Sequence, residues 1–229
     1  MITPFDFEFL TKKVSERLYQ GTSKSVFNKT HRDLAKFGNK KTKRNKAQQK
    51  RILEIGAGSG EFYDFIHKDF KEYFMTDISE WGKEEILKLV DKDPRVKFEV
   101  QDVEKLRFDD NYFDRVVVSC VIAHVTEPYK ALEEIKRVTK PNGVISIFIS
   151  SDPSIMLRLV RKLLIQKKMK NLPIPYKLIN SIQHRNSPTT ILNMAEYIFK
   201  QDQVKVNYLP FYVKSWNLST HLILNVVKS

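Results

Sequence analysis

The chain of 229 residues has little cysteine and no long apolar run. Its one cysteine, Cys120, excludes an intrachain disulfide and a zinc site built from cysteines. No apolar stretch reaches the length of a membrane-spanning helix, and acids interrupt residues 1–20, where a secretory signal needs an unbroken apolar region. We therefore expect a cytoplasmic protein, and the length suits one α/β domain with a full core.

Acidic residues are also missing from part of the chain, because residues 153–195 contain none. The formal net charge of +13 is divided unevenly: residues 1–51 carry +10, residues 52–152 carry −7 and residues 153–229 carry +10. An acidic central segment with two basic flanks favours an anionic partner for the flanks. The alternative is that the flanks are solvated lysine-rich surface.

Three glycines at alternate positions follow a short apolar strand in Ile52-Leu53-Glu54-Ile55-Gly56-Ala57-Gly58-Ser59-Gly60. This spacing lets the backbone turn sharply and approach a ligand closely, and the next helix then presents free N–H groups to it. It is typical of a nucleotide-type cofactor site. The dinucleotide fingerprint G-x-G-x-x-G needs a third glycine at position 61, where this chain has Glu61, so NAD fits poorly.

Three further strands are expected, ending at Asp77, Asp102 and Cys120. A carboxylate at Asp77 can accept both hydroxyls of a ribose, and the alternative is that it caps a helix over residues 81–90. Alternating strands and helices predict a parallel sheet with right-handed crossovers and helices on both faces. All these strand tips then meet Gly56 at the carboxyl edge of the sheet, where ligands bind.

The glycine-rich pattern resembles the first motif of the class I S-adenosylmethionine-dependent methyltransferases. The helix expected over residues 127–138 and the Pro-Asn-Gly turn at 141–143 are similar to the small-molecule, methyltransferase type 11-like branch of that family. The resemblance covers about residues 51–150. It implies an α/β, Rossmann-like, doubly wound sheet of seven strands, mostly parallel with an antiparallel last strand, plus helical lid segments. Residues 204–209 and 221–227 are the candidates for the closing strands.

The same resemblance implies S-adenosyl-L-methionine as the cofactor and gives roles to the strand tips. The glycine loop packs under the methionine end, Asp77 holds the ribose, Asp102 meets the adenine amino group and Val103 packs on the ring. The expected cofactor-binding residues are Glu54, Gly56, Ala57, Gly58, Gly60, Asp77, Ile78, Asp102, Val103 and Cys120.

Two histidine segments are candidates for chemistry on the acceptor. His124 follows the fourth strand, where a base could take a proton from a hydroxyl or amine nucleophile, and the alternative is a histidine that anchors its loop. His184 and Arg185 resemble a His-Arg-Asn stretch of methyltransferases from surface-polysaccharide clusters, and we expect them to bind the acceptor; the alternative is a capped turn. No histidine shows ligand spacing, so no catalytic metal is indicated.

We expect a single methyltransferase domain in four parts: a basic N-terminal cap (1–50), a cofactor-binding core (51–150), a basic helical insertion or lid (151–200) and closing strands (201–229). In the family, the first and third parts fold over the active site. Two basic lids would attract a small, anionic acceptor such as a sugar, a nucleotide-sugar or a lipid-linked glycan intermediate.

Within the insertion, residues 155–164 have helical spacing. Such a basic amphipathic helix can lie on a membrane surface, but we favour a lid whose apolar face packs inward. The apolar face is formed by Met156, Leu159, Val160, Leu163 and Leu164. The opposite, basic face is formed by Arg158, Arg161 and Lys162.

The sequence therefore predicts an S-adenosylmethionine-dependent methyltransferase acting on an oxygen or nitrogen of a small, anionic acceptor. An RNA methyltransferase is the second hypothesis, supported by the basic flanks but lacking an aromatic stripe for nucleic acid, which makes nucleic acid the less favoured partner. A binding module that keeps the cofactor without turnover is the third. Peripheral membrane contact is an option for the insertion, and no obligate protein partner is indicated.

Overall fold

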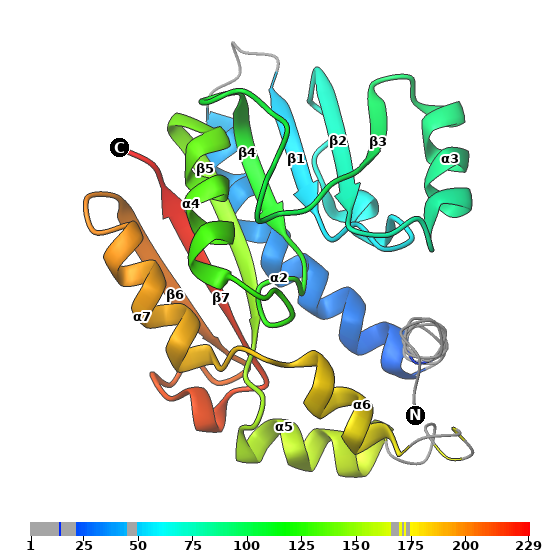
Figure 1. Ribbon diagram of the computed structural model, residues 1–229, viewed down its shortest axis with the longest axis vertical. Coiled ribbons are helices and arrows are strands. Elements are labelled where there is room, and N and C mark those ends of the chain that lie inside the picture. Colours follow the sequence, from blue (N-terminus) through cyan, green and yellow to red (C-terminus); the bar gives the residue numbers. More distant parts are fainter. Residues whose placement is uncertain (1–13, 15–21, 45–49, 166–169, 171, 173–174) are drawn as a thin grey trace.

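The computed structural model describes residues 14, 22–44, 50–165, 170, 172 and 175–229. Its strands are β1 (Arg51–Ile55), β2 (Glu72–Asp77), β3 (Val96–Val100), β4 (Phe113–Val118), β5 (Thr139–Ser150), β6 (Gln203–Leu209) and β7 (His221–Val227). They form one sheet in the order β3-β2-β1-β4-β5-β7-β6 (Figure 1). The first five pair in parallel, and β7 runs antiparallel to both β5 and β6. The predicted fold class and both closing strands are confirmed.

Helices cover both faces of this sheet (Figure 1). One face carries α2 (Thr22–Arg44), the short 3₁₀ helix η1 (Glu61–Phe65) and α3 (Lys83–Lys92), and the other carries α4 (Pro128–Val138) and α7 (Pro188–Ile198). Beyond the carboxyl ends of the parallel strands lie α5 (Ile155–Val160), η2 (Arg161–Ile165) and α6 (Tyr176–Gln183). A last turn, η3 (Trp216–Leu218), joins β6 to β7. None of the helices in the described ranges is both long and apolar enough to cross a bilayer.

The core consists of two layers because side chains alternate along each strand. On β4, Val116 and Val118 pack toward α4 and α7, whereas Val117 packs toward α2. Each of these valines is fully buried, which contributes on the order of 1.5–3 kcal/mol per side chain. The two layers hold the strands, and therefore their carboxyl ends, in a fixed arrangement.

A buried arginine joins α2 to the sheet. The Arg115 side chain is fully buried; its Nη1 donates to Asn39 Oδ1 (2.6 Å) and its Nη2 donates to the Ala35 carbonyl (3.1 Å). Gly38 makes room for it, since a Cβ at that position would lie 2.4 Å from the guanidinium carbon. Burial lowers the pKa of Arg115 to about 10, so the group stays charged at neutral pH.

The structure differs from the sequence-based expectation after the glycine loop. In place of a regular helix the chain forms η1, a 3₁₀ helix of five residues that begins at Glu61, directly after Gly60 in the left-handed conformation. Phe62 of this turn is buried, and the His31 ring of α2 meets the Phe62 and Phe65 rings edge-on (5.6 and 5.5 Å). Helix α2 already covers this part of the sheet, and the aromatic side chains of η1 pack against α2.

Candidate active site

The glycine loop is held against the two neighbouring strands by its backbone. The amides of Gly56 and Ala57 both donate to the Thr76 carbonyl at the end of β2 (2.8 and 3.0 Å). Gly56 has a φ of +77°, and a Cβ there would lie 2.2 Å from Val121 Cγ2 and 2.8 Å from the Ser119 carbonyl oxygen. A side chain at Gly56 is therefore excluded both by conformation and by space. The loop after β4 passes directly against the glycine loop.

Asp77 lies at the tip of β2 and faces this loop. The Gly58 amide donates to Asp77 Oδ2 (3.0 Å), and the Ser79 amide donates to Oδ1 (3.1 Å). The alternative role as a helix cap does not occur, because α3 begins after Gly82. The Asp77 carboxylate thus lies beside a loop whose glycines leave open the space that side chains would fill. This arrangement fits the ribose end of a nucleoside cofactor.

The residues expected around the adenine differ in exposure. Ile78, next to Asp77, is 73% exposed. Asp102 is exposed as well and accepts a hydrogen bond from the Glu104 amide (2.9 Å). Val103 is buried in the core layer under α4, so little of its surface is free to pack on an adenine ring. Ile78 is thus the better-placed apolar surface at this edge.

Glu54 lies beneath the loop and does not face into it. It is almost completely buried, and the Tyr73 hydroxyl donates to its Oε2 (2.5 Å), whereas Oε1 has no hydrogen-bond partner among the described residues. Burial raises the pKa of Glu54 to about 8. The carboxyl is therefore mostly protonated in the folded protein at neutral pH, and its side chain supports the loop from below.

Replacing Glu54 with glutamine is expected to stabilise the protein more at pH 8 than at pH 5. In the unfolded chain Glu54 ionises near its ordinary pKa of about 4.3, whereas in the folded chain it ionises only near 8. Between these two pH values the unfolded chain loses the proton and the folded chain keeps it, so the free energy of unfolding of the wild-type protein falls as pH rises. Glutamine does not ionise, so the variant avoids this loss, and its free energy of unfolding relative to wild type should be higher at pH 8 than at pH 5 by up to a few kcal/mol. Thermal unfolding at both pH values measures it, with exposed Glu196→Gln as the control. An equal shift at both pH values would contradict the protonated state.

The end of β4 brings Cys120 and His124 to the same edge. Cys120 has a left-handed backbone (φ +58°), and its Sγ lies 3.8 Å from His124 Nε2. His124 Nδ1 lies 2.9 Å from the Gln183 carbonyl oxygen, which can only accept, so Nδ1 carries the hydrogen. Nε2 is therefore the acceptor nitrogen of the ring, and on the side of the strand ends its neighbour is the Cys120 thiol, which can donate to it. Burial lowers the pKa of His124, which keeps the ring neutral at pH 7.

The segment between α6 and α7 carries His184 to the same place. The Arg185 amide donates to the Ala123 carbonyl (2.8 Å), and Asn186 Nδ2 donates to the Val125 carbonyl (2.8 Å). These bonds fix the segment to the loop after β4, and the His124 and His184 rings lie 4.8 Å apart. The structure thus brings together two segments that the sequence analysis names separately. The Arg185 side chain is exposed and its Nη1 donates to Thr126 Oγ1 (3.2 Å).

A partly buried ion pair joins the end of β5 to the insertion, and it brings in Asp152, which the sequence analysis does not name. Asp152 Oδ1 pairs with Arg161 Nη1 (2.8 Å), and Asn180 Nδ2 donates to Asp152 Oδ2. His184 Nδ1 lies 3.6 Å from the same carboxylate, and burial lowers the pKa of His184 to about 4. Asp152 lies two residues after the end of β5, so the rule that selected the residues at the other strand ends also applies to it.

Arg161 has a different position from the one predicted. The sequence places it on the outward basic face of the insertion, but its side chain turns inward to Asp152 and is only 17% exposed. Burial works to raise the pKa of Asp152, but the hydrogen bond and the charge of Arg161 outweigh it, and the pKa is lowered. The pair is therefore ionised and close to neutral overall. Lys167 and Lys168 of the same basic run lie outside the described residues.

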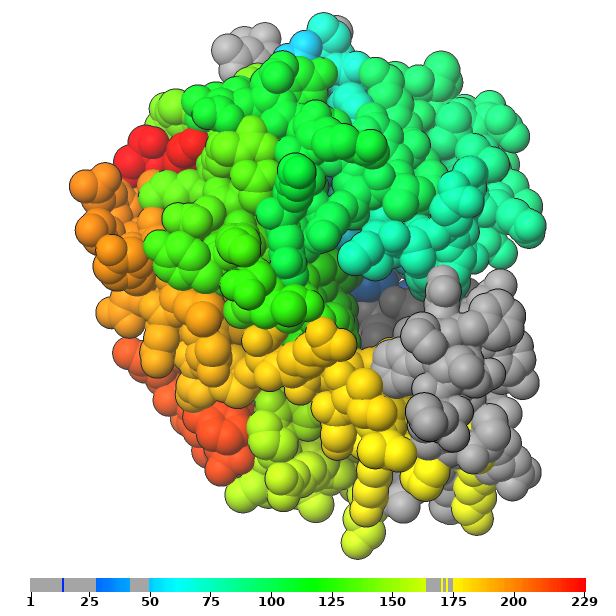
Figure 2. Space-filling view, viewed as in Figure 1, coloured from blue at the N-terminus to red at the C-terminus, as the bar shows by residue number. Residues whose placement is uncertain are grey.

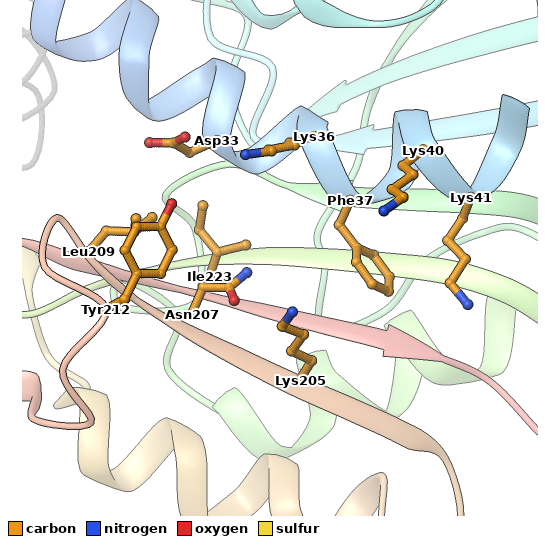
Figure 3. Close-up of a pocket in the computed structure, with 10 residues that line it drawn as sticks. All are labelled: Asp33, Lys36, Phe37, Lys40, Lys41, Lys205, Asn207, Leu209, Tyr212 and Ile223. Carbon is orange, nitrogen blue, oxygen red and sulfur yellow. The ribbon is translucent and has the colours of Figure 1, made fainter.

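Figure 2 shows a hollow between the strand ends and α6, with atoms of α2 at its floor. A separate groove of about 340 Å³ lies between α2 and the β6–β7 edge (Figure 3). Its walls carry Lys36, Lys40 and Lys41 from α2 and Lys205 from β6, opposite Tyr212. None of the predicted site residues lines this groove.

Comparison with known proteins identifies the central part of the chain. Residues 53–147 match the family model described as a methyltransferase domain. The chain is 36% identical over 107 residues to a demethylmenaquinone methyltransferase from Clavibacter sepedonicus, covering 47% of this chain and 44% of that protein. It is 35% identical over 104 residues to a ubiquinone/menaquinone biosynthesis C-methyltransferase from Burkholderia orbicola, covering 42% of each. The chain thus spans less than half the length of these curated relatives.

Solved structures agree on the fold. The N-methyltransferase NodS from Bradyrhizobium japonicum, solved with S-adenosyl-l-homocysteine, superimposes with a TM-score of 0.66 at 12% identity and covers 97% of each chain. A protein from Pyrococcus horikoshii gives a TM-score of 0.57 at 19% identity, covering 80% of this chain and 83% of that one. The family-model match and the relatives confirm the methyltransferase domain and its S-adenosylmethionine cofactor as the sequence predicts them.

Proposed function

We propose that this chain, whose residues 53–147 form a class I S-adenosylmethionine-dependent methyltransferase domain, methylates a small acceptor that carries an ionisable hydroxyl or amine. The observation that supports this most is the state of His124. Its Nδ1 hydrogen is held by the Gln183 carbonyl, its pKa is lowered by burial, and its unprotonated Nε2 lies beside the end of β4, 3.8 Å from Cys120 Sγ. A neutral imidazole with an unprotonated nitrogen can act as a general base when an acceptor hydroxyl or amine takes the place of the thiol beside it.

The residues at the strand ends would hold the cofactor. Gly56 and Gly58 have no side chains to block its approach to the backbone, and Asp77 accepts hydrogen bonds from the ribose hydroxyls. Ile78 offers an apolar surface to the adenine. When bound, S-adenosylmethionine supplies a methyl group on a positively charged sulfur. The protein must then hold the acceptor in line with that methyl group, which by itself accounts for much of the rate.

His124 would take the proton of the acceptor as the new bond to the methyl group forms. His184 lies beside it with its ring tilted, held by Asp152 and by the Asn180 carbonyl (3.1 Å), so the wall facing the acceptor is held rigidly. Arg185 lies at the open side of this wall. It would provide the positive charge that orients an anionic or polar acceptor.

The sugar, nucleotide-sugar or lipid-linked glycan acceptor remains a proposal. Arg161 is neutralised by Asp152, so the inner wall of the lid is less positive than the basic sequence of the insertion predicts. A hydroxylated aromatic ring is the second candidate, favoured by the identity to enzymes named for quinone methylation. Deprotonating such a hydroxyl would activate the oxygen and the adjacent ring carbons alike. RNA is the third candidate.

Arg185→Ala is expected to raise the Michaelis constant for the acceptor by about 10–150-fold, because one charge-assisted hydrogen bond contributes roughly 1.5–3 kcal/mol. The affinity for S-adenosylmethionine should not change. Release of S-adenosylhomocysteine is measured with three acceptor classes: hydroxylated quinols, nucleotide-sugars and RNA. Lys177→Ala, an exposed change on α6, is the control.

The pattern of the results separates the candidates. A quinol or sugar acceptor whose Michaelis constant rises in Arg185→Ala supports the proposed site, and a constant that rises with salt identifies the acceptor as anionic. Turnover of RNA alone would replace the proposal by the RNA hypothesis. Turnover of a small acceptor with an unchanged Michaelis constant in Arg185→Ala would remove Arg185 from the site.

A further inference from the structure

The outward side of the lid is unexpectedly apolar. Ile155, Leu159 and Leu163 are 55%, 49% and 72% exposed, and their spacing of four residues places them in one row along α5 and η2. Helix α5 has no buried residue. The inward packing predicted for Leu159 and Leu163 is therefore wrong; it is Arg161 that turns inward.

The hairpin between β6 and β7 extends this row. Ser154 Oγ donates to the Ser219 carbonyl (2.7 Å), and the Ile155 amide donates to Asn217 Oδ1 (3.0 Å), which fixes the start of α5 to η3. Leu218 of η3 is 47% exposed. Figure 1 shows α5 and this hairpin next to each other at the lid end of the molecule. Together with Arg158 and Lys162, these apolar side chains form what we call the outer lid face: Ile155, Arg158, Leu159, Lys162, Leu163 and Leu218.

Charge indicates what this face meets. Arg158 and Lys162 are exposed and alternate with the apolar row. Residues 153–195 and 203–229 contain no acid, and Asp152 is already paired with Arg161, so these two segments offer no negative charge to Arg158 or Lys162. A second copy of the same face would bring like charges together. An anionic bilayer matches both properties, because its head groups attract the cations while the interface accepts the apolar side chains.

We propose that the outer lid face docks on the surface of an anionic lipid bilayer. Docking needs neither cofactor nor turnover, so it stands apart from the proposed methyl transfer. If both hold, the lid that covers the acceptor site rests on the membrane, and an acceptor dissolved in lipid reaches the site without crossing water.

Flotation of the full chain with vesicles tests this. The protein should float with phosphatidylcholine vesicles that contain phosphatidylglycerol and much less with phosphatidylcholine alone. Two variants probe the two properties of the face: Arg158→Glu with Lys162→Glu, and Leu159→Asp with Leu163→Asp. Each should weaken binding at least roughly tenfold, since each basic residue near an anionic surface contributes a severalfold factor.

The matched control changes charge equally but elsewhere. Lys40→Glu with Lys41→Glu alters the groove of Figure 3 by the same net charge and should keep binding within about twofold. An equal loss in this control would mean attraction by net charge alone and would overturn the docking face. So would a wild-type protein that does not float with either vesicle, or a Leu159→Asp, Leu163→Asp variant that becomes monomeric from a wild-type dimer in sedimentation. Circular dichroism confirms that each variant is folded.

Discussion

His124→Ala is expected to lower the rate of methyl transfer by about 10²–10⁴, the usual contribution of a positioned general base. The affinity for S-adenosylmethionine should stay the same, because the glycine loop and Asp77 do not depend on the imidazole. Single-turnover rates with a competent acceptor, together with calorimetry for the cofactor, measure the two effects separately. His67→Ala, an exposed histidine away from the strand ends, is the control.

The pH dependence gives a second readout for His124. Because burial lowers its pKa, the wild-type rate should fall on the acid side only below the ordinary histidine value of about 6.5. His124→Ala should lose this acid limb along with the rate. A full rate in the variant would mean that orientation alone drives the reaction and that His124 only anchors its loop through Gln183.

Asp77→Ala is expected to weaken binding of S-adenosylmethionine and S-adenosylhomocysteine by about 10–150-fold. The carboxylate would accept hydrogen bonds from the ribose, and bonds to a charged acceptor contribute roughly 1.5–3 kcal/mol. Calorimetric titration with S-adenosylhomocysteine measures the change, and Asp91→Ala on the exposed side of α3 is the control.

The Asp77 variant also needs a check on folding, since Asp77 holds the Gly58 amide in the protein itself. Asp77→Asn can still accept one bond from Gly58 and should fall between wild type and alanine in affinity. Unchanged affinity in a folded Asp77→Ala protein would remove the ribose role.

The cofactor end of the site is predictable from the sequence because it depends on backbone geometry. Glycines with left-handed φ at 56, 58 and 60 and an acid at the tip of the next strand have to meet at the carboxyl edge of any parallel sheet. The strand order and the antiparallel β7 likewise follow from the alternation of strands and helices together with the family pattern. Local sequence therefore determines this half of the site.

The acceptor end is not predictable in the same way, because it depends on contacts between distant segments. Asp152 and Arg161 belong to β5's end and to η2, and their pairing turns Arg161 away from the face that helical spacing assigns to it. Helix periodicity indicates which residues share a side, but pairing with the partly buried Asp152 carboxylate decides that Arg161 faces inward. Glu54 is a second example: the sequence assigns it to the cofactor loop, but in the fold it is buried beside Tyr73, which donates a hydrogen bond to it.

The outer lid face follows from this pairing. Once Arg161 faces inward, Leu159 and Leu163 face water on a helix where the amphipathic pattern places them inside. The helix thus presents Leu159 and Leu163 outward beside Arg158 and Lys162, two basic residues that the helical pattern places on the opposite face.

The most direct test of the central claim is transfer of a deuterated methyl group from S-adenosylmethionine. The full chain is incubated with lipid and aqueous extracts of its source cells, and the products are read by mass spectrometry. We predict a new species that carries the deuterated methyl group with the wild-type protein and is lost with His124→Ala. If no fraction yields such a species while S-adenosylhomocysteine still binds, the chain is a cofactor-binding module and the proposed enzyme does not exist.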